Sequence, residues 1–158
     1  NGVLQHIRSY FFGKIVGYAY TGTDGKPVEI IPIVNETCEC KSYFANGKIS
    51  RQFSLTNGNF NGEYLEYYEN GTTFMKSVYQ NDIAEGMKTT YWSNGKVKLE
   101  ETYVHGNKEG LVKHYNSTGG LTKTEMYLLD VKHGPTQIYK AGKVVKTLSY
   151  YDSVLLIK

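Results

Sequence analysis

The sequence has few of the residues that mark a dedicated chemistry. Its 158 residues include two cysteines, three prolines and one tryptophan, and the cysteines stand together as Cys38-Glu39-Cys40. A structural zinc site needs a second ligand pair, which is missing. The Cys-x-Cys spacing is too tight for an ordinary disulfide along one strand. We therefore interpret both residues as structural or incidental thiols and expect neither a metal nor a cofactor.

Long apolar runs and clusters of one charge are also missing. No stretch is long enough to span a membrane as a helix. The 18 basic and 15 acidic residues are interspersed and give a net charge of +3. Because no cluster of five or more Lys and Arg occurs, nucleic acid is not an expected partner.

Catalytic signatures are equally scarce. The sequence contains no nucleophile elbow, no Gly-rich phosphate loop and no zinc-binding His pair. His105 and His133 stand in predicted turns. Asp82 and Asp130 lack the nine-residue glycine repeat of calcium turns, so we interpret them as turn formers. We predict that the protein is not an enzyme.

What the sequence does contain is a repeat of 24 residues. One glycine column and one tyrosine column follow it, and Asn-Gly pairs recur at Asn46, Asn70 and Asn94. Asn-Gly is a strong hairpin signal, and the intervening stretches are rich in Tyr, Val, Thr and Phe, as strands are. The two columns, which we expect to be structural, are Gly62, Gly86, Gly110 and Gly134, and Tyr67, Tyr91, Tyr115 and Tyr139. The repeat predicts an all-β protein, an elongated antiparallel meander of stacked β-hairpins.

The turn type decides which residues share a face. With a three-residue loop that ends in a glycine bulge, Tyr67 lies on the same side as Thr73 and Tyr79. We favour this loop. It predicts a buried face with a ladder of packed tyrosine rings.

The first residues keep this composition but lose the repeat. Residues 11–20 read as a strand, Asp24-Gly25 as its turn, and residues 28–34 as a return strand interrupted by Pro32. A short helix over residues 3–12 is the alternative. We expect a single repeat domain over residues 1–158, with a degenerate N-terminal cap (1–42), repeats (43–151) and a C-terminal cap (152–158).

A row of aromatic residues falls on the face predicted to be wet. Tyr64, Tyr68, Phe74 and Trp92 form this candidate partner-binding face. A row of aromatics across adjacent strands can make a flat sheet a recognition surface. The alternative is that this face packs on the N-terminal segment.

Several blocks resemble a known repeat. The runs 67–71 (Tyr-Tyr-Glu-Asn-Gly), 91–103 and 106–110 are similar to the bacterial MORN-variant repeat of YwqK-like proteins, and the similarity spans about residues 43 to 151. This resemblance implies stacked β-hairpins. It also implies a non-catalytic protein of the antitoxin or immunity type that binds another protein.

Two other functions stay open: a cell-envelope or surface scaffold that self-associates through a sheet edge, and binding of glycan or cell-wall polymer by the tyrosine-rich face. The sequence begins at Asn1 without an initiator Met or a signal peptide. The expected compartment is therefore cytoplasmic for an antitoxin, and periplasmic or cell-surface if a leader has been removed.

Overall fold

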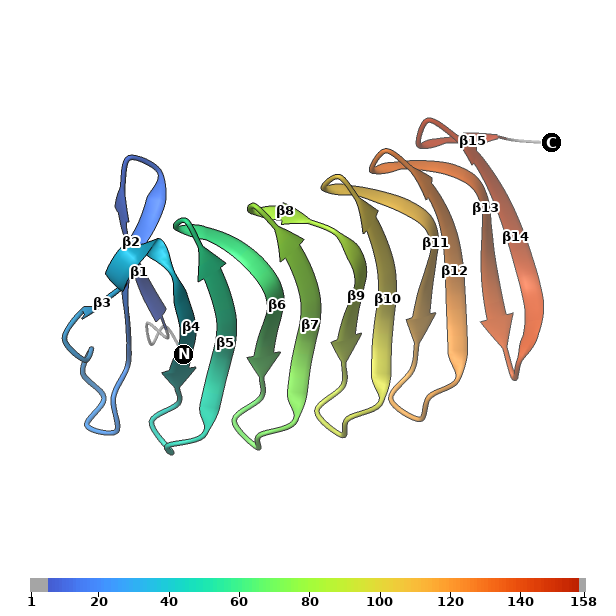
Figure 1. Cartoon of the computed structure of the whole chain (residues 1–158). Coiled ribbons are helices and arrows are strands. Elements are labelled where there is room, and N and C mark those ends of the chain that lie inside the picture. The colour runs from blue at the N-terminus through green and yellow to red at the C-terminus, as the bar shows by residue number, and fades with distance from the viewer. Residues whose placement is uncertain (1–5, 157–158) are drawn as a thin grey trace. The chain divides into compact units, whose positions relative to one another are not determined.

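The computed structural model describes residues 6–156. Apart from a 3-10 turn, η1 (Val34–Glu36), its regular elements are β-strands (Figure 1). The all-β antiparallel meander that the repeat predicted is confirmed. The chain forms two compact units, Asn1–Ile83 and Ala84–Lys158, and the short strand β8 (Ile83–Ala84) lies at their boundary. Whether the chain is one domain stays a prediction.

The N-terminal unit contains two sheets. β1 (His6–Phe11), β2 (Lys14–Tyr20) and β3 (Ile31–Pro32) form a small antiparallel sheet. β4 (Cys38–Tyr43), β5 (Ile49–Thr56), β6 (Asn59–Tyr67) and β7 (Thr73–Gln80) pair in chain order as a meander.

The C-terminal unit is a single meander in chain order. Its strands are β9 (Gly86–Tyr91), β10 (Val97–Val104), β11 (Asn107–Tyr115), β12 (Leu121–Leu128), β13 (Val131–Lys140), β14 (Lys143–Tyr151) and β15 (Val154–Leu156). All the pairs are antiparallel. Residues 157–158 of the predicted C-terminal cap lie outside the described residues.

The Asn-Gly turns are three-residue loops, as predicted. In the loop between β9 and β10, Trp92 N–H donates to the Lys96 carbonyl at 2.8 Å, and Gly95 has φ +82°. Asn94 Oδ1 accepts the Lys96 N–H at 3.1 Å. Glycine holds this left-handed conformation without a steric penalty, which is why it ends each loop.

The turn that joins one hairpin to the next has two residues, both with positive φ. Asn81 and Asp82 have φ values of +50° and +67°, as a type I′ turn requires. Asp82 Oδ1 also accepts the Phe60 N–H of the preceding hairpin at 2.6 Å, and Asp130 does the same for Lys108 at 2.7 Å. Both aspartates are therefore turn formers, as predicted, and each also ties its turn to the previous repeat.

The prediction that Tyr67 and Tyr79 share one buried face is wrong. Tyr67 does pair with Thr73, but Glu66 pairs with Met75. This bulge leaves Phe74 as an extra residue and reverses the alternation of side chains along β7. Tyr79 therefore lies on the face of Tyr64, with ring centroids 5.8 Å apart, and Tyr67 lies on the other face.

The repeat glycines lie in strands opposite tyrosines. Gly110 pairs with Tyr127, and Gly134 pairs with Tyr150. All four glycines of the column have positive φ, between +75° and +107°. Glycine inside a strand marks a bulge or bend, so these positions are structural.

The N-terminal segment differs from its prediction in detail. Phe12-Gly13, with φ +47° and +79°, divides the expected strand 11–20 and makes a hairpin of β1 and β2. The alternative helix is wrong for residues 6–11, which are strand, while residues 3–5 lie outside the described residues. The expected return strand is reduced to Ile31–Pro32, paired with β2.

The β1–β2 hairpin covers one face of the meander in the N-terminal unit. Ile15 and Tyr18 of β2 pack with Phe53, Leu55 and other side chains in the main buried cluster of this unit. The Tyr18 and Phe53 ring centroids are 6.0 Å apart. We call this covered side the inner face.

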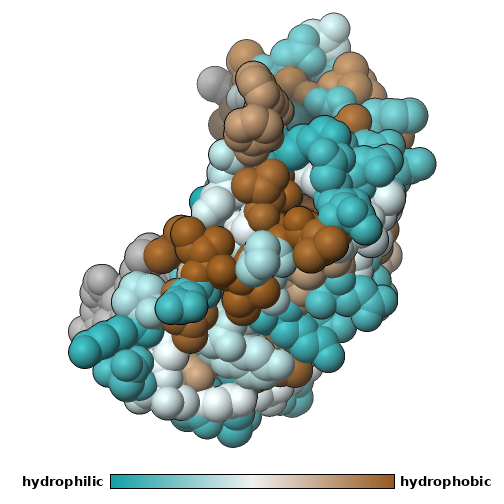
Figure 2. Space-filling view, turned by 60° about the vertical axis from the view of Figure 1, so that its left-hand side comes forward, coloured by the Kyte–Doolittle hydropathy of each residue, from teal (hydrophilic) through white to brown (hydrophobic). Residues whose placement is uncertain are grey.

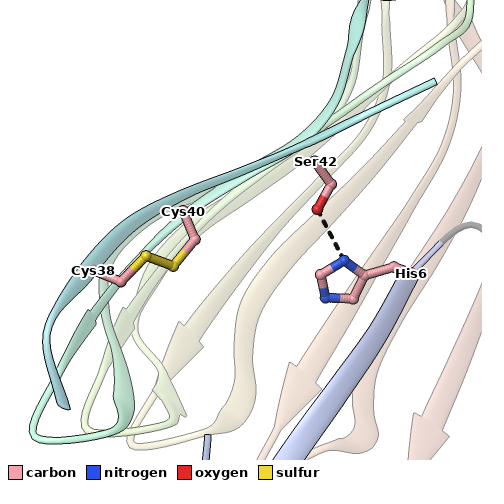
Figure 3. Close-up of a disulfide and its surroundings, with 4 residues drawn as sticks. All are labelled: His6, Cys38, Cys40 and Ser42. Carbon is pink, nitrogen blue, oxygen red and sulfur yellow. Dashed lines mark hydrogen bonds between the residues drawn. A yellow bond between two sulfur atoms is a disulfide. The ribbon is translucent and has the colours of Figure 1, made fainter. Parts of the chain in front are cut away.

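Cys38 and Cys40 form a disulfide on β4, contrary to the prediction of two thiols (Figure 3). Both side chains leave the same side of the strand, since residues two apart share a face. Their Cα atoms are 5.3 Å apart, within the range that a disulfide bridges and below the roughly 6.6 Å of two fully extended residues. The shortened local geometry makes the tight spacing compatible with a bond.

Candidate functional site

A pocket opens on the inner face of the N-terminal unit, between the β1–β2 hairpin and strands β6 and β7. Its volume is about 470 Å³, within the range of small-molecule sites. Three rings form its aromatic wall: Phe60, Tyr64 and Tyr79, with centroids 5.4 to 5.8 Å apart. Met75 and Ile15 add apolar surface. The pocket thus combines aromatic and apolar walls with charged groups from Arg8, Glu66 and Asp82.

Glycine allows the hairpin to approach the meander beside this pocket. A Cβ on Gly58, which has φ +74°, would meet Lys14 Cβ at 2.7 Å. Ile15 N–H donates to the Gly58 carbonyl at 3.2 Å. Any larger residue at Gly58 would push β2 away and widen the pocket.

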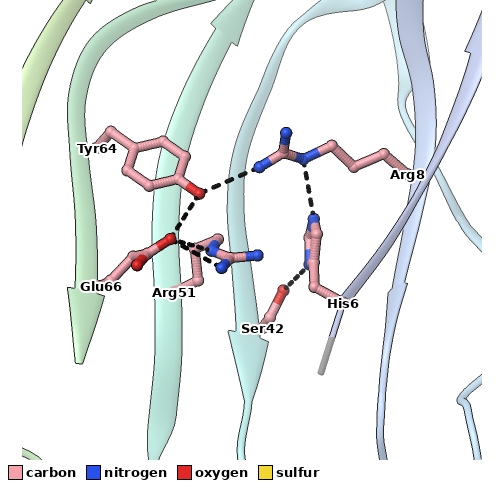
Figure 4. A network of polar contacts seen from close by, with 6 residues as sticks. All are labelled: His6, Arg8, Ser42, Arg51, Tyr64 and Glu66. Carbon is pink, nitrogen blue, oxygen red and sulfur yellow. Dashed lines mark hydrogen bonds and ion pairs between the residues drawn. The ribbon is translucent and has the colours of Figure 1, made fainter. Parts of the chain in front are cut away.

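Arg8 of β1 brings a guanidinium group into the pocket (Figure 4). Its Nη2 donates to Tyr64 Oη at 3.1 Å, and its Nε donates to His6 Nε2 at 3.2 Å. The guanidinium carbon lies 4.9 Å from the Phe60 ring centroid, within cation–π range. These contacts fix the position of Arg8.

The acceptor role of His6 follows from this geometry. Arg8 Nε can only donate, so His6 Nε2 is the unprotonated nitrogen, and Nδ1–H donates to Ser42 Oγ at 2.9 Å. Burial, followed by the charges of Arg51 and Arg8, lowers the pKa of His6 to about 4. His6 is therefore neutral at pH 7 and supports the Arg8 side chain.

The two carboxylates that line the pocket, Glu66 and Asp82, already have hydrogen-bond or ion-pair partners. Glu66 Oε1 accepts from Tyr64 Oη at 3.1 Å and forms an ion pair with Arg51 at 2.8 Å. Burial raises the pKa of Tyr64 to about 12, so its hydroxyl stays protonated as a donor. Asp82 lies exposed at the rim and accepts the Phe60 N–H. Within residues 6–156, no ion pair joins Arg8 to a carboxylate.

The predicted partner-binding face is only partly open. The expectation that Tyr64 lies on a wet face is wrong, because its exposed fraction is 7% beneath the hairpin. Tyr68 and Phe74 are half-buried and pack on each other with centroids 5.2 Å apart. In the C-terminal unit, Trp92 Nε1 donates to the Tyr115 carbonyl at 3.1 Å, and Lys98 covers its ring. The role of the last three as a partner-binding face stays a prediction.

The C-terminal unit buries a carboxylate among cations. Glu125, of which 4% is exposed, contacts Lys132 at 2.7 Å, Lys123 at 2.9 Å and His114 Nε2 at 2.7 Å. Burial alone would raise the pKa of Glu125, but hydrogen bonds from these three side chains outweigh it and lower the pKa to about 2. Burial lowers the pKa of His114, so neutral His114 donates from Nε2. This cluster is satisfied internally and stabilises the unit.

Exposed apolar side chains gather on the N-terminal unit. Figure 2 shows them on the side of this unit turned toward the viewer. Phe12 is 91% exposed, and exposed apolar residues of this segment also include Phe11, Val16, Ile30 and Val34. We call these five residues the apolar patch. Exposed apolar patches of this kind mark interaction surfaces.

Sequence reasoning did not find the polar network that lies in and beside the pocket. His6, Arg8 and Arg51 are brought together by strands 35 or more residues apart, and no short motif joins them. Within residues 6–156, no three His, Cys, Asp or Glu side chains gather as a metal site. The same part of the chain has no helix long and apolar enough to cross a bilayer.

Comparison with known proteins supports the repeat. Residues 60–81 and 84–105 each match the model of the MORN repeat variant. A search of curated proteins found no match. The two matches support a repeat-based binding scaffold and leave the partner open.

Proposed function

We propose that the protein is a non-catalytic scaffold that binds another protein, of the immunity or antitoxin type. The observation that carries this proposal is the apolar patch. Phe11 and Phe12 are 64% and 91% exposed at a hairpin turn, where rings that served only folding would be buried. Burial of this surface against a partner removes apolar area from water, which is the main driving force of association.

The repeats supply a rigid base for such a surface. The matched segments resemble a repeat whose general role is binding, and the hairpin that carries Phe11, Phe12 and Val16 of the patch is held by the buried cluster around Phe53. A partner can therefore bind without ordering this backbone, which lowers the entropic cost of association. Tyr68 and Phe74 in the N-terminal unit, and separately Trp92 in the C-terminal unit, are proposed as further contact residues.

Co-purification from the native host tests this function. We expect one stoichiometric protein partner, and protection of cells against a toxin encoded next to this chain. Phe12→Ser should weaken the complex at least about tenfold, as the loss of an exposed anchor does. Val145→Ser is the matched control, since Val145 is 58% exposed in β14. Recovery of the protein alone, with no protection against the neighbouring toxin, would contradict the proposal.

One observation favours a second candidate, a surface scaffold that self-associates. β15 is the terminal strand in the order of its meander, and its residues Val154, Leu155 and Leu156 are 64%, 42% and 51% exposed. An exposed apolar edge strand can pair with a second copy. Light scattering across a concentration series tests this: self-association that Leu155→Lys abolishes would support the scaffold, and a monomer at all concentrations would exclude it.

A further inference from the structure

We propose that the inner-face pocket of the N-terminal unit binds a small aromatic carboxylate, with its carboxylate on Arg8 and its ring among Tyr10, Phe60 and Tyr79. This site is distinct from the apolar patch, and the proposal does not depend on a protein partner. It rests on the absence of a counter-ion for Arg8 among the described residues, on the volume of the pocket and on its aromatic walls.

The first step concerns the unpaired charge. A guanidinium has five N–H donors, and Arg8 uses Nε–H for His6 and one Nη2–H for Tyr64. Both acceptors are neutral groups, so the hydrogen bonds hold Arg8 without cancelling its charge. A half-buried cation without a counter-ion favours an anion that presents two oxygens to its remaining donors.

The neighbouring carboxylates do not take this role. Glu66 is paired with Arg51, and its Oε1 also accepts from Tyr64. Asp82 is exposed at the rim and bonded to a backbone N–H, where water and salt screen its charge. The guanidinium is thus the one charged group lining the pocket that is half-buried and lacks an opposite charge among residues 6–156.

The second step concerns the body of the ligand. The volume of about 470 Å³ has room for a substituted aromatic ring. Phe60, Tyr64 and Tyr79 meet at tilted or edge-to-face angles and leave apolar surface toward the pocket. Tyr10 lines the pocket and is 57% exposed, so it can close over a ring that has entered. Aromatic rings pack favourably on such walls, which favours an aromatic body for the ligand.

The experiment is a calorimetric titration of the whole protein with 4-hydroxyphenylacetate and with its neutral amide, 4-hydroxyphenylacetamide. The carboxylate should bind one to one, and the amide at least about tenfold more weakly, because only the carboxylate forms charge-assisted hydrogen bonds. In ¹⁵N-labelled protein, the Arg8 Nε–H resonance should shift with the same saturation curve.

Variants locate the site. Arg8→Gln should weaken carboxylate binding to about the affinity of the amide. Lys98→Gln should leave it unchanged, because Lys98 is a cation on an aromatic ring in the other unit. Tyr10→Ala should weaken both compounds several-fold through lost ring contact. Since Tyr10 is exposed, this variant and the acid–amide comparison decide the matter even if Arg8→Gln fails to fold.

Three outcomes would overturn the proposal. They are equal affinities for the acid and the amide, an Arg8→Gln protein that folds and binds the acid as well as the wild type, and the absence of saturable binding up to roughly 10 mM, where even weak small-ligand sites fill.

Discussion

The side-chain amide of Asn94 donates a hydrogen bond to the carbonyl of Ser117 in the next hairpin, with a distance of 2.8 Å. Asn46 makes the equivalent bond to Glu69 in the N-terminal unit, at 3.0 Å. These two Asn-Gly turns therefore do more than reverse their own strands. The asparagine of each also joins one hairpin to the next, which is a second physical reason why asparagine recurs at this position.

Asn94→Ala tests this link. The substitution removes the bond to Ser117 and the bond from the Lys96 N–H, and should lower the free energy of unfolding by about 1 to 2 kcal/mol. Asn94→Asp keeps the acceptor oxygen but loses the donor, so about half of that loss should remain. Urea unfolding measures both variants. An Asp variant as stable as the wild type would mean that the link between hairpins contributes nothing.

Glu125→Gln should strongly destabilise the C-terminal unit. The change leaves Lys123 and Lys132 without their shared carboxylate in a half-buried site. Breaking a fully buried pair costs about 3 to 5 kcal/mol, and because both lysines retain water contact we expect about 2 to 3 kcal/mol. Glu63→Gln is the matched control, since the Glu63–Lys76 pair is exposed and should cost at most about 1 kcal/mol. Similar losses in the two variants, measured by urea unfolding, would contradict the proposed burial of Glu125.

Protonation of Glu125 should lower the free energy of unfolding in acid. The folded-state pKa of Glu125, about 2, lies below its ordinary value of 4.5, so its contribution is present above pH 4.5 and is lost as the pH falls toward 2. The wild type and Glu125→Gln should therefore converge in stability across this window. A constant difference between them from pH 6 to pH 2 would show that the lowered pKa is absent.

Protonation of His6 should lower the free energy of unfolding over a second pH range, higher than that of Glu125. Its folded-state pKa of about 4 lies below the ordinary value of 6.5 for histidine, so the unfolded chain takes up the proton first and stability falls as the pH drops from 6.5 to 4. His6→Gln can accept from Arg8 and donate to Ser42 without titrating, and should flatten this part of the profile. A His6→Gln profile as steep as that of the wild type would refute the assignment.

The repeat glycines should differ in their tolerance of a side chain. A Cβ on Gly110, with φ +77°, meets no atom within 4 Å, whereas a Cβ on Gly134, with φ +107°, lies 3.3 Å from Met126 Cβ. Gly110→Ala should cost about 1 to 2 kcal/mol for its left-handed backbone, and Gly134→Ala should cost more. Thermal unfolding of both variants checks the order, and the reverse order would contradict it.

Much of the fold could be predicted from the repeat because turn chemistry is local. Asn70-Gly71 specifies a three-residue loop, and Asp82 marks a turn, from short-range backbone preferences alone. The face assignment failed because Phe74 adds one residue in a bulge, and a shift of one residue reverses every side chain after it. Nothing in the composition of the strand marks that extra residue.

The candidate site could not be predicted from the sequence, for a different reason. Tyr64 repeats the pattern of an exposed strand residue, and only the packing of β2 buries it. Arg8 and His6 lie in a segment without the repeat, so no register indicated that they would face Tyr64 and Ser42. For Tyr64, the structure supports the alternative that it packs on the N-terminal segment; the role of Tyr68, Phe74 and Trp92 stays a prediction.

The most direct test of the whole account is the contact between the N-terminal hairpin and the inner face, because the buried cluster and the pocket both depend on it. A nuclear Overhauser spectrum of the full chain should show cross-peaks between the rings of Tyr18 and Phe53, whose centroids are 6.0 Å apart, and between Arg8 and Phe60. Absence of both sets of cross-peaks, together with a solvent-exposed Tyr64 ring, would contradict the account.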